Sequence, residues 1–294
     1  MDPSSPSSGD TTLSPTSGTS SQDSFDELAE SAQAARFESI GGVIKSLNDC
    51  HVALLEDKTR EQFLFFAGVP EGVVTTLSDE ASRTSKLSRI LYSPKTSTLV
   101  LKVMPGLDHE IATRALSSKI LLKLIEMNVR REIYELGSCT VRIGDWVKEA
   151  DMCWGPKRQR GQLSAVLETG LSESSQRLAL DARGWLETAG STVELVIALD
   201  LNRDCPQMTV KRWELRPRPP VPTTRNASEA MASAVQTITV SRASTLTIVS
   251  DSLTLPFTKL VAREPNSSNE TDLVIEKQAL ADVAEEVWEY QGFL

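Results

Sequence analysis

The stretch from Val193 to Leu201 constrains the fold more than any other part of this sequence. It reads Val-Glu-Leu-Val-Ile-Ala-Leu-Asp-Leu, which is nearly continuous in apolar residues. A strand covered on both faces has this pattern, whereas a strand with one face in water alternates. Met208 to Leu215 does alternate and predicts a half-exposed neighbouring strand. A central strand with both faces covered needs layers on either side of its sheet, so the sequence predicts a mixed α/β fold.

Apolar residues at three- and four-residue intervals predict the helices of those layers. His109 to Met127 has the clearest spacing, and residues 174–188 and 276–290 share it. From Phe25 to about Leu47 the spacing is interrupted near Gly41-Gly42, so we expect a broken helix there.

Shorter apolar and β-branched segments predict further strands. Thr98 to Met104 ends at a Pro-Gly turn, as a strand commonly does. Cys139 to Ile143 and Ser164 to Glu168 are similar in composition, whereas Phe63 to Ala67 fits a buried strand or a helix end equally well. Residues 70–92 show no pattern that favours either element.

Composition divides the chain into five parts. Residues 1–24 are almost wholly Ser, Thr, Pro, Gly and Asp, which cannot bury enough apolar area to fold. Arg216 to Pro222 is rich in proline, which cannot donate to a sheet. We therefore expect a disordered tail (1–24), an N-terminal helical or mixed extension (25–96), a core (97–215), a Pro-rich linker or loop (216–235), and C-terminal strands with a helix packing on the core (236–294).

Charge limits what the chain can bind. The formal net charge is −9, and the first 35 residues hold six acidic residues and no Lys or Arg, so −9 minus −6 leaves about −3 for the rest. Sequence-independent attraction to phosphates comes from clustered cations, which this balance does not favour. Any contact with DNA is therefore expected to be local and weak.

Cysteine and histidine usage argues against a zinc site. The four cysteines are widely spaced with no CxxC pair, and the two histidines are His51 and His109. The sequence starts without a basic segment followed by an apolar stretch, and it has no run of about 18 apolar residues. We expect an intracellular protein, cytoplasmic or nuclear, with reduced thiols, no membrane contact and no small-molecule cofactor.

Three stretches carry acidic residues where strands are expected to end or helices to begin. They are Met104-Pro-Gly-Leu-Asp-His-Glu110, Lys148-Glu-Ala-Asp151 and Leu167-Glu-Thr-Gly-Leu-Ser172. In this order, between the expected elements, they resemble the PD-(D/E)xK nuclease superfamily and its restriction-endonuclease-like proteins, including a branch of hypothetical proteins of fungi. The resemblance covers residues 97–215. It implies a restriction-endonuclease-like mixed central sheet flanked by helices, here with a C-terminal β-rich extension and closing helix.

The resemblance also implies a nuclease site that depends on magnesium. Asp151 and Glu168 would hold Mg²⁺ through hard carboxylate oxygens, with Glu110 as a third ligand. The family's lysine stands two residues after that glutamate, where this sequence has Gly170. Glycine offers no donor, and Arg177 is the nearest cation in sequence that would replace the lysine. Catalysis is therefore expected to be weakened or lost, and a non-catalytic scaffold for nucleic acid or protein is the alternative.

A basic loop lies between the two carboxylates in the sequence. Lys157, Arg158 and Arg160 are expected to contact a DNA backbone, although three solvated loop charges give only weak attraction. The Ser/Pro-rich tail and the Arg-Pro segment at residues 216–222 are candidate binding segments for protein partners.

Each candidate residue also has a structural interpretation. Asp151 would cap a turn, and Glu168 would pair with Arg177 at a rim. Glu110 would stand in a first helical turn because of the helix dipole, and His109 would pack or cap beside it. Convergence of Asp151, Glu168 and Arg177 would favour an enzyme, and divergence would favour the scaffold.

Overall fold

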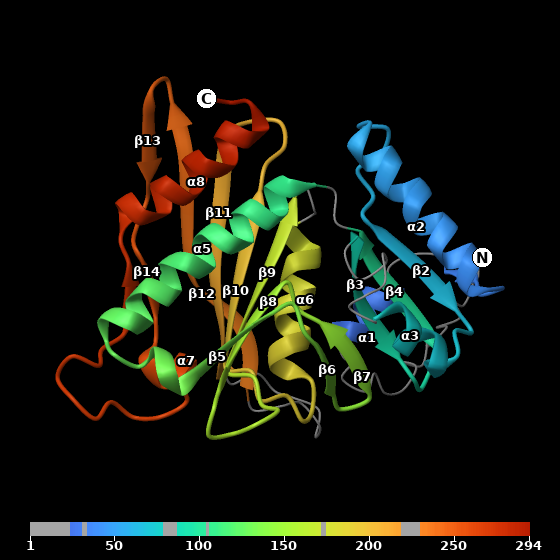
Figure 1. Ribbon diagram of the computed structural model, residues 1–294, viewed down its shortest axis with the longest axis horizontal. Coiled ribbons are helices and arrows are strands. Elements are labelled where there is room, and N and C mark those ends of the chain that lie inside the picture. The colour runs from blue at the N-terminus through green and yellow to red at the C-terminus, as the bar shows by residue number, and fades with distance from the viewer. Residues whose placement is uncertain (1–23, 31–33, 79–86, 104–105, 172–174, 219–229) are drawn as a thin grey trace, which may run out of the picture.

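The computed structural model describes residues 24–30, 34–78, 87–103, 106–171, 175–218 and 230–294. These residues form one sheet of seven strands, one of six and one of two (Figure 1). In spatial order, the seven-stranded sheet contains β13 (Leu246–Val249), β12 (Ala230–Ala243), β11 (Gln207–Pro217), β10 (Leu195–Leu201), β9 (Ala165–Leu171), β8 (Met152–Pro156) and β5 (Ile133–Gly137).

Strand β10 lies in the interior of this sheet, as its apolar sequence predicted. It runs parallel to β9, where Ala198 stands opposite Glu168, and antiparallel to β11, where Val196 stands opposite Trp213. Both faces of β10 are covered, because its alternate residues pack into two separate hydrophobic clusters. The expected mixed α/β class, with a mixed sheet flanked by helices, is confirmed.

Helices cover the two faces of the seven-stranded sheet. On one face α5 (Leu107–Glu126) and α8 (Lys277–Gln291) pack beside each other, with α7 (Phe257–Val261) and the strand pair β14 (Leu253–Leu255) and β15 (Leu273–Ile275) at their side (Figure 1). On the other face, α6 (Ser175–Glu187) buries Trp185 against the sheet. A 3₁₀ turn, η1 (Arg130–Glu132), joins α5 to β5.

The six-stranded sheet stands beside this assembly and carries helix α2 (Ile40–Leu55) on its outer side (Figure 1). In spatial order it contains β1 (Ala35–Arg36), β2 (Phe63–Ala67), β4 (Thr98–Val103), β3 (Ser88–Ser93), β7 (Trp146–Glu149) and β6 (Thr140–Ile143), accompanied by α1 (Ser24–Glu30), α2 (Ile40–Leu55) and α3 (Glu71–Leu77). Strands β3 and β4 pair across residue 97, so the expected N-terminal extension and core share this sheet.

Phe25 ties α1 to the rest of the molecule. Its ring makes edge contacts with Trp146 of β7 and Trp185 of α6, at centroid distances of 5.5 and 6.5 Å. A Cβ on Gly184 would stand 2.1 Å from that ring, so glycine is what allows the two helices to approach.

Several sequence expectations need correction. The broken helix from Phe25 to Leu47 is wrong: two helices flank a short strand, and α2 begins at Ile40, so that Gly41-Gly42 stands in its first turn, where the Ser39 side chain caps the Gly42 N–H. Ser24, assigned to the tail, begins α1 and is buried.

The expected linker at residues 216–235 is partly sheet. Pro217 ends β11 opposite Ala230 of β12, which is compatible with proline because the pair closes the ladder. Residues 219–229, like residues 1–23 of the expected tail, lie outside the described residues. Among the helices described, none combines the length and apolar character needed to cross a membrane.

Candidate active site

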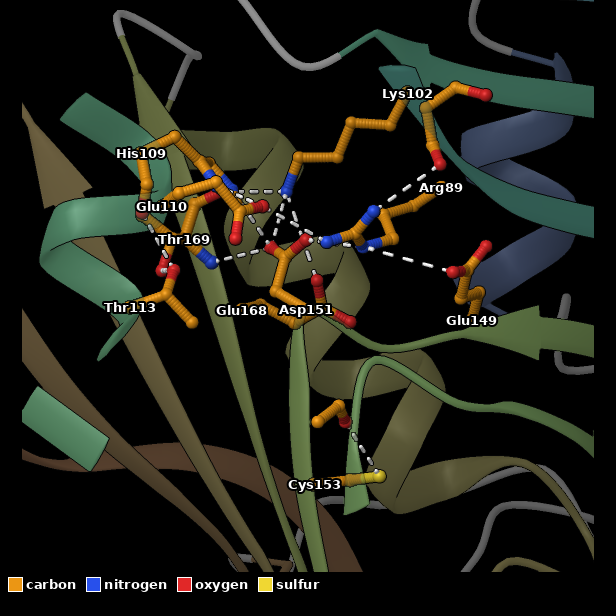
Figure 2. A network of polar contacts seen from close by, with 12 residues as sticks. Arg89, Lys102, His109, Glu110, Thr113, Glu149, Asp151, Cys153, Glu168 and Thr169 are labelled. Atoms are coloured by element: carbon orange, nitrogen blue, oxygen red, sulfur yellow. Dashed lines mark hydrogen bonds and ion pairs between the residues drawn. The ribbon is translucent and has the colours of Figure 1, made fainter. Parts of the chain in front are cut away.

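The acidic residues singled out in the sequence meet where the two large sheets join. Asp151 lies between β7 and β8, which belong to different sheets, and Glu168 lies on β9. Lys102 reaches the same point from β4 (Figure 2). The side chains of Lys102, Asp151 and Glu168 are 6%, 0% and 1% exposed, so this cluster is almost fully buried.

The contacts of Asp151 favour its ionised form. Its Oδ2 accepts hydrogen bonds from the Lys102 ammonium at 3.3 Å and the Thr169 N–H at 2.9 Å. His109 Nε2 lies 3.2 Å from the same oxygen, and Arg89 Nε lies 3.2 Å from Oδ1. Burial opposes ionisation, but these neighbours, Lys102 foremost, hold the pKa of Asp151 well below its usual range. Asp151 is therefore charged at neutral pH.

The surroundings of Glu168 act in the opposite direction. Its Oε1 accepts a hydrogen bond from Trp185 Nε1 at 2.6 Å and lies 3.6 Å from Lys148 Nζ. Burial nevertheless raises the pKa of Glu168 to about 8, against the opposing effect of Lys148. Burial also raises the pKa of Glu149, next to Arg89, to about 7. Both glutamates thus retain protons near neutral pH.

Lys102 is the cation that the sequence analysis missed. Its ammonium donates a hydrogen bond to the Thr169 carbonyl at 2.8 Å and lies 3.8 Å from Glu168 Oε2, besides its contact with Asp151. One side chain therefore reaches both carboxylates that the resemblance identified. Lys102 is the charged residue of β4, whose other residues after Thr98 are apolar and buried, and that anomaly was the available signal.

The cluster is short of positive charge. It contains five carboxylates and three cations: Glu110, Glu149, Asp151, Glu168 and Asp181, with Arg89, Lys102 and Lys148. With all of these ionised, five negative and three positive formal charges leave −2, a balance that counts neither the exposed Arg114, 3.9 Å from Glu110, nor His109, 3.2 Å from Asp151. Because uncompensated charge is costly in a buried site, the glutamates take up protons.

The donor atoms fit the magnesium ion that the resemblance implies. Asp151 Oδ1 and Glu168 Oε2 are buried oxygens without a hydrogen bond, although Arg89 Nε lies 3.2 Å from the first and Lys102 Nζ 3.8 Å from the second. Hard carboxylate oxygens are the ligands that magnesium prefers. Within the described ranges, no three His, Cys, Asp or Glu side chains form a metal site. Magnesium often binds proteins through only one or two carboxylates and takes its other ligands from water and phosphate.

The structure does not bring Arg177 or Glu110 into the position expected. Arg177 pairs with Glu61 and lies over the Phe63 ring, 4.6 Å from its centroid, so its ion pair among the described residues is not with Glu168. Glu110 is 35% exposed and pairs with Arg89 at 3.2 Å. Arg89 also pairs with Asp151, so Glu110 is linked to Asp151 through Arg89 and is the solvent-exposed member of the cluster.

The basic loop lies far from the carboxylates. Asp151 precedes the first residue of β8 and Lys157 follows its last, so about 20 Å separates them at about 3.3 Å per residue. Lys157 stands over the Tyr134 ring, Arg158 donates to the Ala262 carbonyl, and Arg160 is exposed. The loop therefore does not adjoin the two carboxylates, and its contact with a DNA backbone stays a prediction.

Comparisons with known proteins add little to this geometry. No family model matches the chain, and no curated protein matches it. Among solved structures, it is similar to a crystal structure of a candidate nuclease belonging to DUF820 from Anabaena variabilis, with 13% identity and a TM-score of 0.36, over 66% of this chain and 90% of that one. A likeness at this level carries no conclusion about function.

Proposed function

We propose that this chain is a restriction-endonuclease-like protein that hydrolyses phosphodiester bonds of DNA with magnesium, with Lys102 in place of the lysine missing at Gly170. The observation that carries this proposal is the reach of one ammonium to Asp151 Oδ2, Glu168 Oε2 and the Thr169 carbonyl. A catalytic cation acts through the position of its charge, which a neighbouring strand can supply as well as the same strand.

The residues of the site would have separate roles. Asp151 and Glu168 would hold the metal through Oδ1 and Oε2, the oxygens that accept no hydrogen bond. Bound magnesium would polarise a phosphoryl oxygen and make bound water more acidic. Lys102 would stabilise the negative charge that develops on the phosphoryl group. Arg89, which adjoins both Asp151 and Glu110, would position these carboxylates.

A non-catalytic scaffold is the second candidate, and it is favoured by the divergence of Arg177 from the two carboxylates and by the burial of the cluster. The side chains of Asp151, Glu168, Lys102 and Arg89 are at most 8% exposed. A scissile phosphate would have to enter beside Glu110, the half-buried member of the cluster. In this second function, the ion cluster would join the two sheets, and the fold would serve as a binding platform.

Magnesium calorimetry and plasmid cleavage with the full chain separate the two candidates. For the nuclease we expect magnesium binding and slow cleavage, both lost in Asp151→Asn. We expect Lys102→Met to lose about 10²- to 10³-fold in cleavage rate, the usual effect of removing one electrostatic donor. Arg177→Met is the matched control, because its cation was the sequence-based candidate and pairs with Glu61; it should cleave normally.

The outcomes are distinct once circular dichroism shows that every variant is folded. Wild type that neither binds magnesium nor cleaves DNA would leave the scaffold function. Normal cleavage by Lys102→Met with loss in Arg177→Met would return the cationic role to Arg177. In Lys102→Met, adding Gly170→Lys should restore part of the activity. Gly170 is not among the glycines with positive φ and stands in β9, so its backbone conformation suits a side chain, and circular dichroism checks that the buried position tolerates lysine.

A further inference from the structure

Two of the four cysteines lie against each other. Cys153 is on β8, opposite Gly137 of β5, and Cys139 follows two residues later in the connection to β6. The two sulfur atoms are 2.6 Å apart, and Cys153 Sγ also lies 3.3 Å from the Gly137 carbonyl. The pairing of β5 with β8 therefore holds the two thiols in direct contact.

The two thiols differ in access. Cys153 is 0% exposed and lies on β8, below Asp151 and Glu168 in the view of Figure 2. Cys139 is half-buried and lines a cavity of about 580 Å³, with Leu136 and Gln162 among its walls. A small oxidant can reach Cys139 through this cavity. Cys153 is buried, so its reaction partner is the oxidised sulfur atom of Cys139.

We infer that Cys139 and Cys153 form a site of reversible oxidation, at which peroxide produces a disulfide bond. Cys139 attacks the peroxide, whose O–O bond breaks, giving a sulfenic acid and one water. Cys153 then attacks that sulfur, the S–S bond forms, and the sulfenic oxygen leaves as a second water. Two thiols are oxidised by two electrons, one peroxide is reduced to two waters, and a dithiol reductant reverses the step.

The charge state of the thiols supports this order of events. The hydrogen bond with Cys153 lowers the pKa of Cys139. The thiolate is the nucleophile in both peroxide reduction and thiol exchange, so Cys139 is the first to react. The other two thiols lack this arrangement: Cys50 adjoins the Glu61 carbonyl and Cys205 the Gln207 side chain.

The bond would enclose part of the cluster described above. The chain between the two cysteines contains β6 and β7 and presents Lys148, Glu149 and Asp151. A disulfide bond between Cys139 and Cys153 would reduce the conformational entropy of the unfolded chain. It would therefore stabilise the fold of the segment between them. The inference does not depend on the proposed nuclease function, because it rests on the thiols alone.

Peptide mapping of the full chain tests the inference. Wild type is treated with stoichiometric hydrogen peroxide, the remaining thiols are alkylated, and the protein is digested with trypsin. We expect the loss of two of four free thiols and a linked pair of peptides, residues 132–142 with 149–157. The melting temperature should rise by several degrees, and dithiothreitol should reverse both changes.

Two variants make the result decisive. The double change Cys50→Ser and Cys205→Ser should leave the linkage intact, and Cys139→Ser should abolish it in a protein that remains folded. Folded wild type that keeps both Cys139 and Cys153 alkylatable after peroxide would overturn the inference. Conversion of Cys139 to sulfinic acid without the linked peptides would overturn it as well.

Discussion

Replacing Glu168 by glutamine should change how the stability of the protein depends on pH. Burial raises the pKa of Glu168 from 4.5 to about 8, so the folded protein keeps a proton that the unfolded chain has lost between these pH values. The stabilisation is complete below pH 4.5 and is lost as the pH rises toward 8. Glutamine resembles the protonated side chain, so the Glu168→Gln variant should not show this loss.

The expected size follows from the same pKa. Each pH unit between the unfolded and folded pKa values costs about 1.4 kcal/mol for one proton. Through Glu168 alone, the free energy of unfolding of the wild type should fall by about 3.5 kcal/mol from pH 5 to pH 8. Glu149 titrates in both the wild type and the Glu168→Gln variant. Its contribution to the pH dependence therefore largely cancels when the free energies of unfolding of the two proteins are subtracted.

Urea unfolding at pH 5, 6, 7 and 8 in metal-free buffer, followed by tryptophan fluorescence, measures this difference. The Glu61→Gln variant is the control, because that carboxylate is 53% exposed and lies outside the cluster. We expect wild type and control to lose stability together, while Glu168→Gln becomes more stable than both as the pH rises. Parallel curves for all three proteins would refute the argument that Glu168 is protonated in the fold.

Three further predictions concern packing. Gly184→Ala should cost about 1–3 kcal/mol in urea unfolding, because its Cβ would overlap the Phe25 ring, whereas Gly72→Ala, with no atom within 4 Å of the added Cβ, should cost nothing. Ile197→Asp should abolish soluble expression, since it puts an unpaired charge at a 0% exposed position of β10; a soluble, stable variant would contradict this. Deletion of residues 1–23 should leave the melting temperature unchanged, and a fall of several degrees would show that the segment packs.

The elements of the fold were predictable where burial of apolar side chains alone explains the residue pattern. The apolar run of β10 predicted an interior strand, and the apolar periodicity of α5 predicted a helix that packs on the sheet. Strand β3 was not predicted, although all of its residues are buried. It buries Ser88, Arg89 and Ser93, and Arg89 is there because Asp151 and Glu110 compensate its charge. The residues that compensate the charge of Arg89 are distant in sequence, so the sequence around β3 does not reveal that this strand is buried.

The meeting of the carboxylates was predictable, whereas the cations beside them were not. Asp151 and Glu168 were singled out because their stretches resemble strand segments of the nuclease superfamily, and both lie against Lys102 in the fold. Lys102 donates to the carbonyl of Thr169 across 67 positions of sequence, through the junction of two sheets. Arg177 was the candidate nearest to Gly170 in sequence. In the folded protein Lys102, which is distant in sequence, lies closer to the carboxylates, and Arg177 pairs with Glu61 instead.

The placement of the charges makes the cluster a joint between the two sheets as well as a candidate site. Arg89, Lys102 and Lys148 all come from the six-stranded sheet, whereas Glu168 belongs to β9 of the seven-stranded sheet. Attraction between these groups therefore acts across the junction, where removing one partner of a buried pair typically costs about 3–5 kcal/mol.

A substitution at Lys102 would weaken the contact between the two sheets and the proposed chemistry together. A loss of cleavage must therefore be compared with the stability measured for the same variant. Gly170→Lys resolves the ambiguity, because a lysine on β9 would restore a charge near Glu168 without rebuilding the link to β4. Recovered cleavage in a protein that remains less stable would assign the chemistry to the charge itself and the stability to the connection between the sheets.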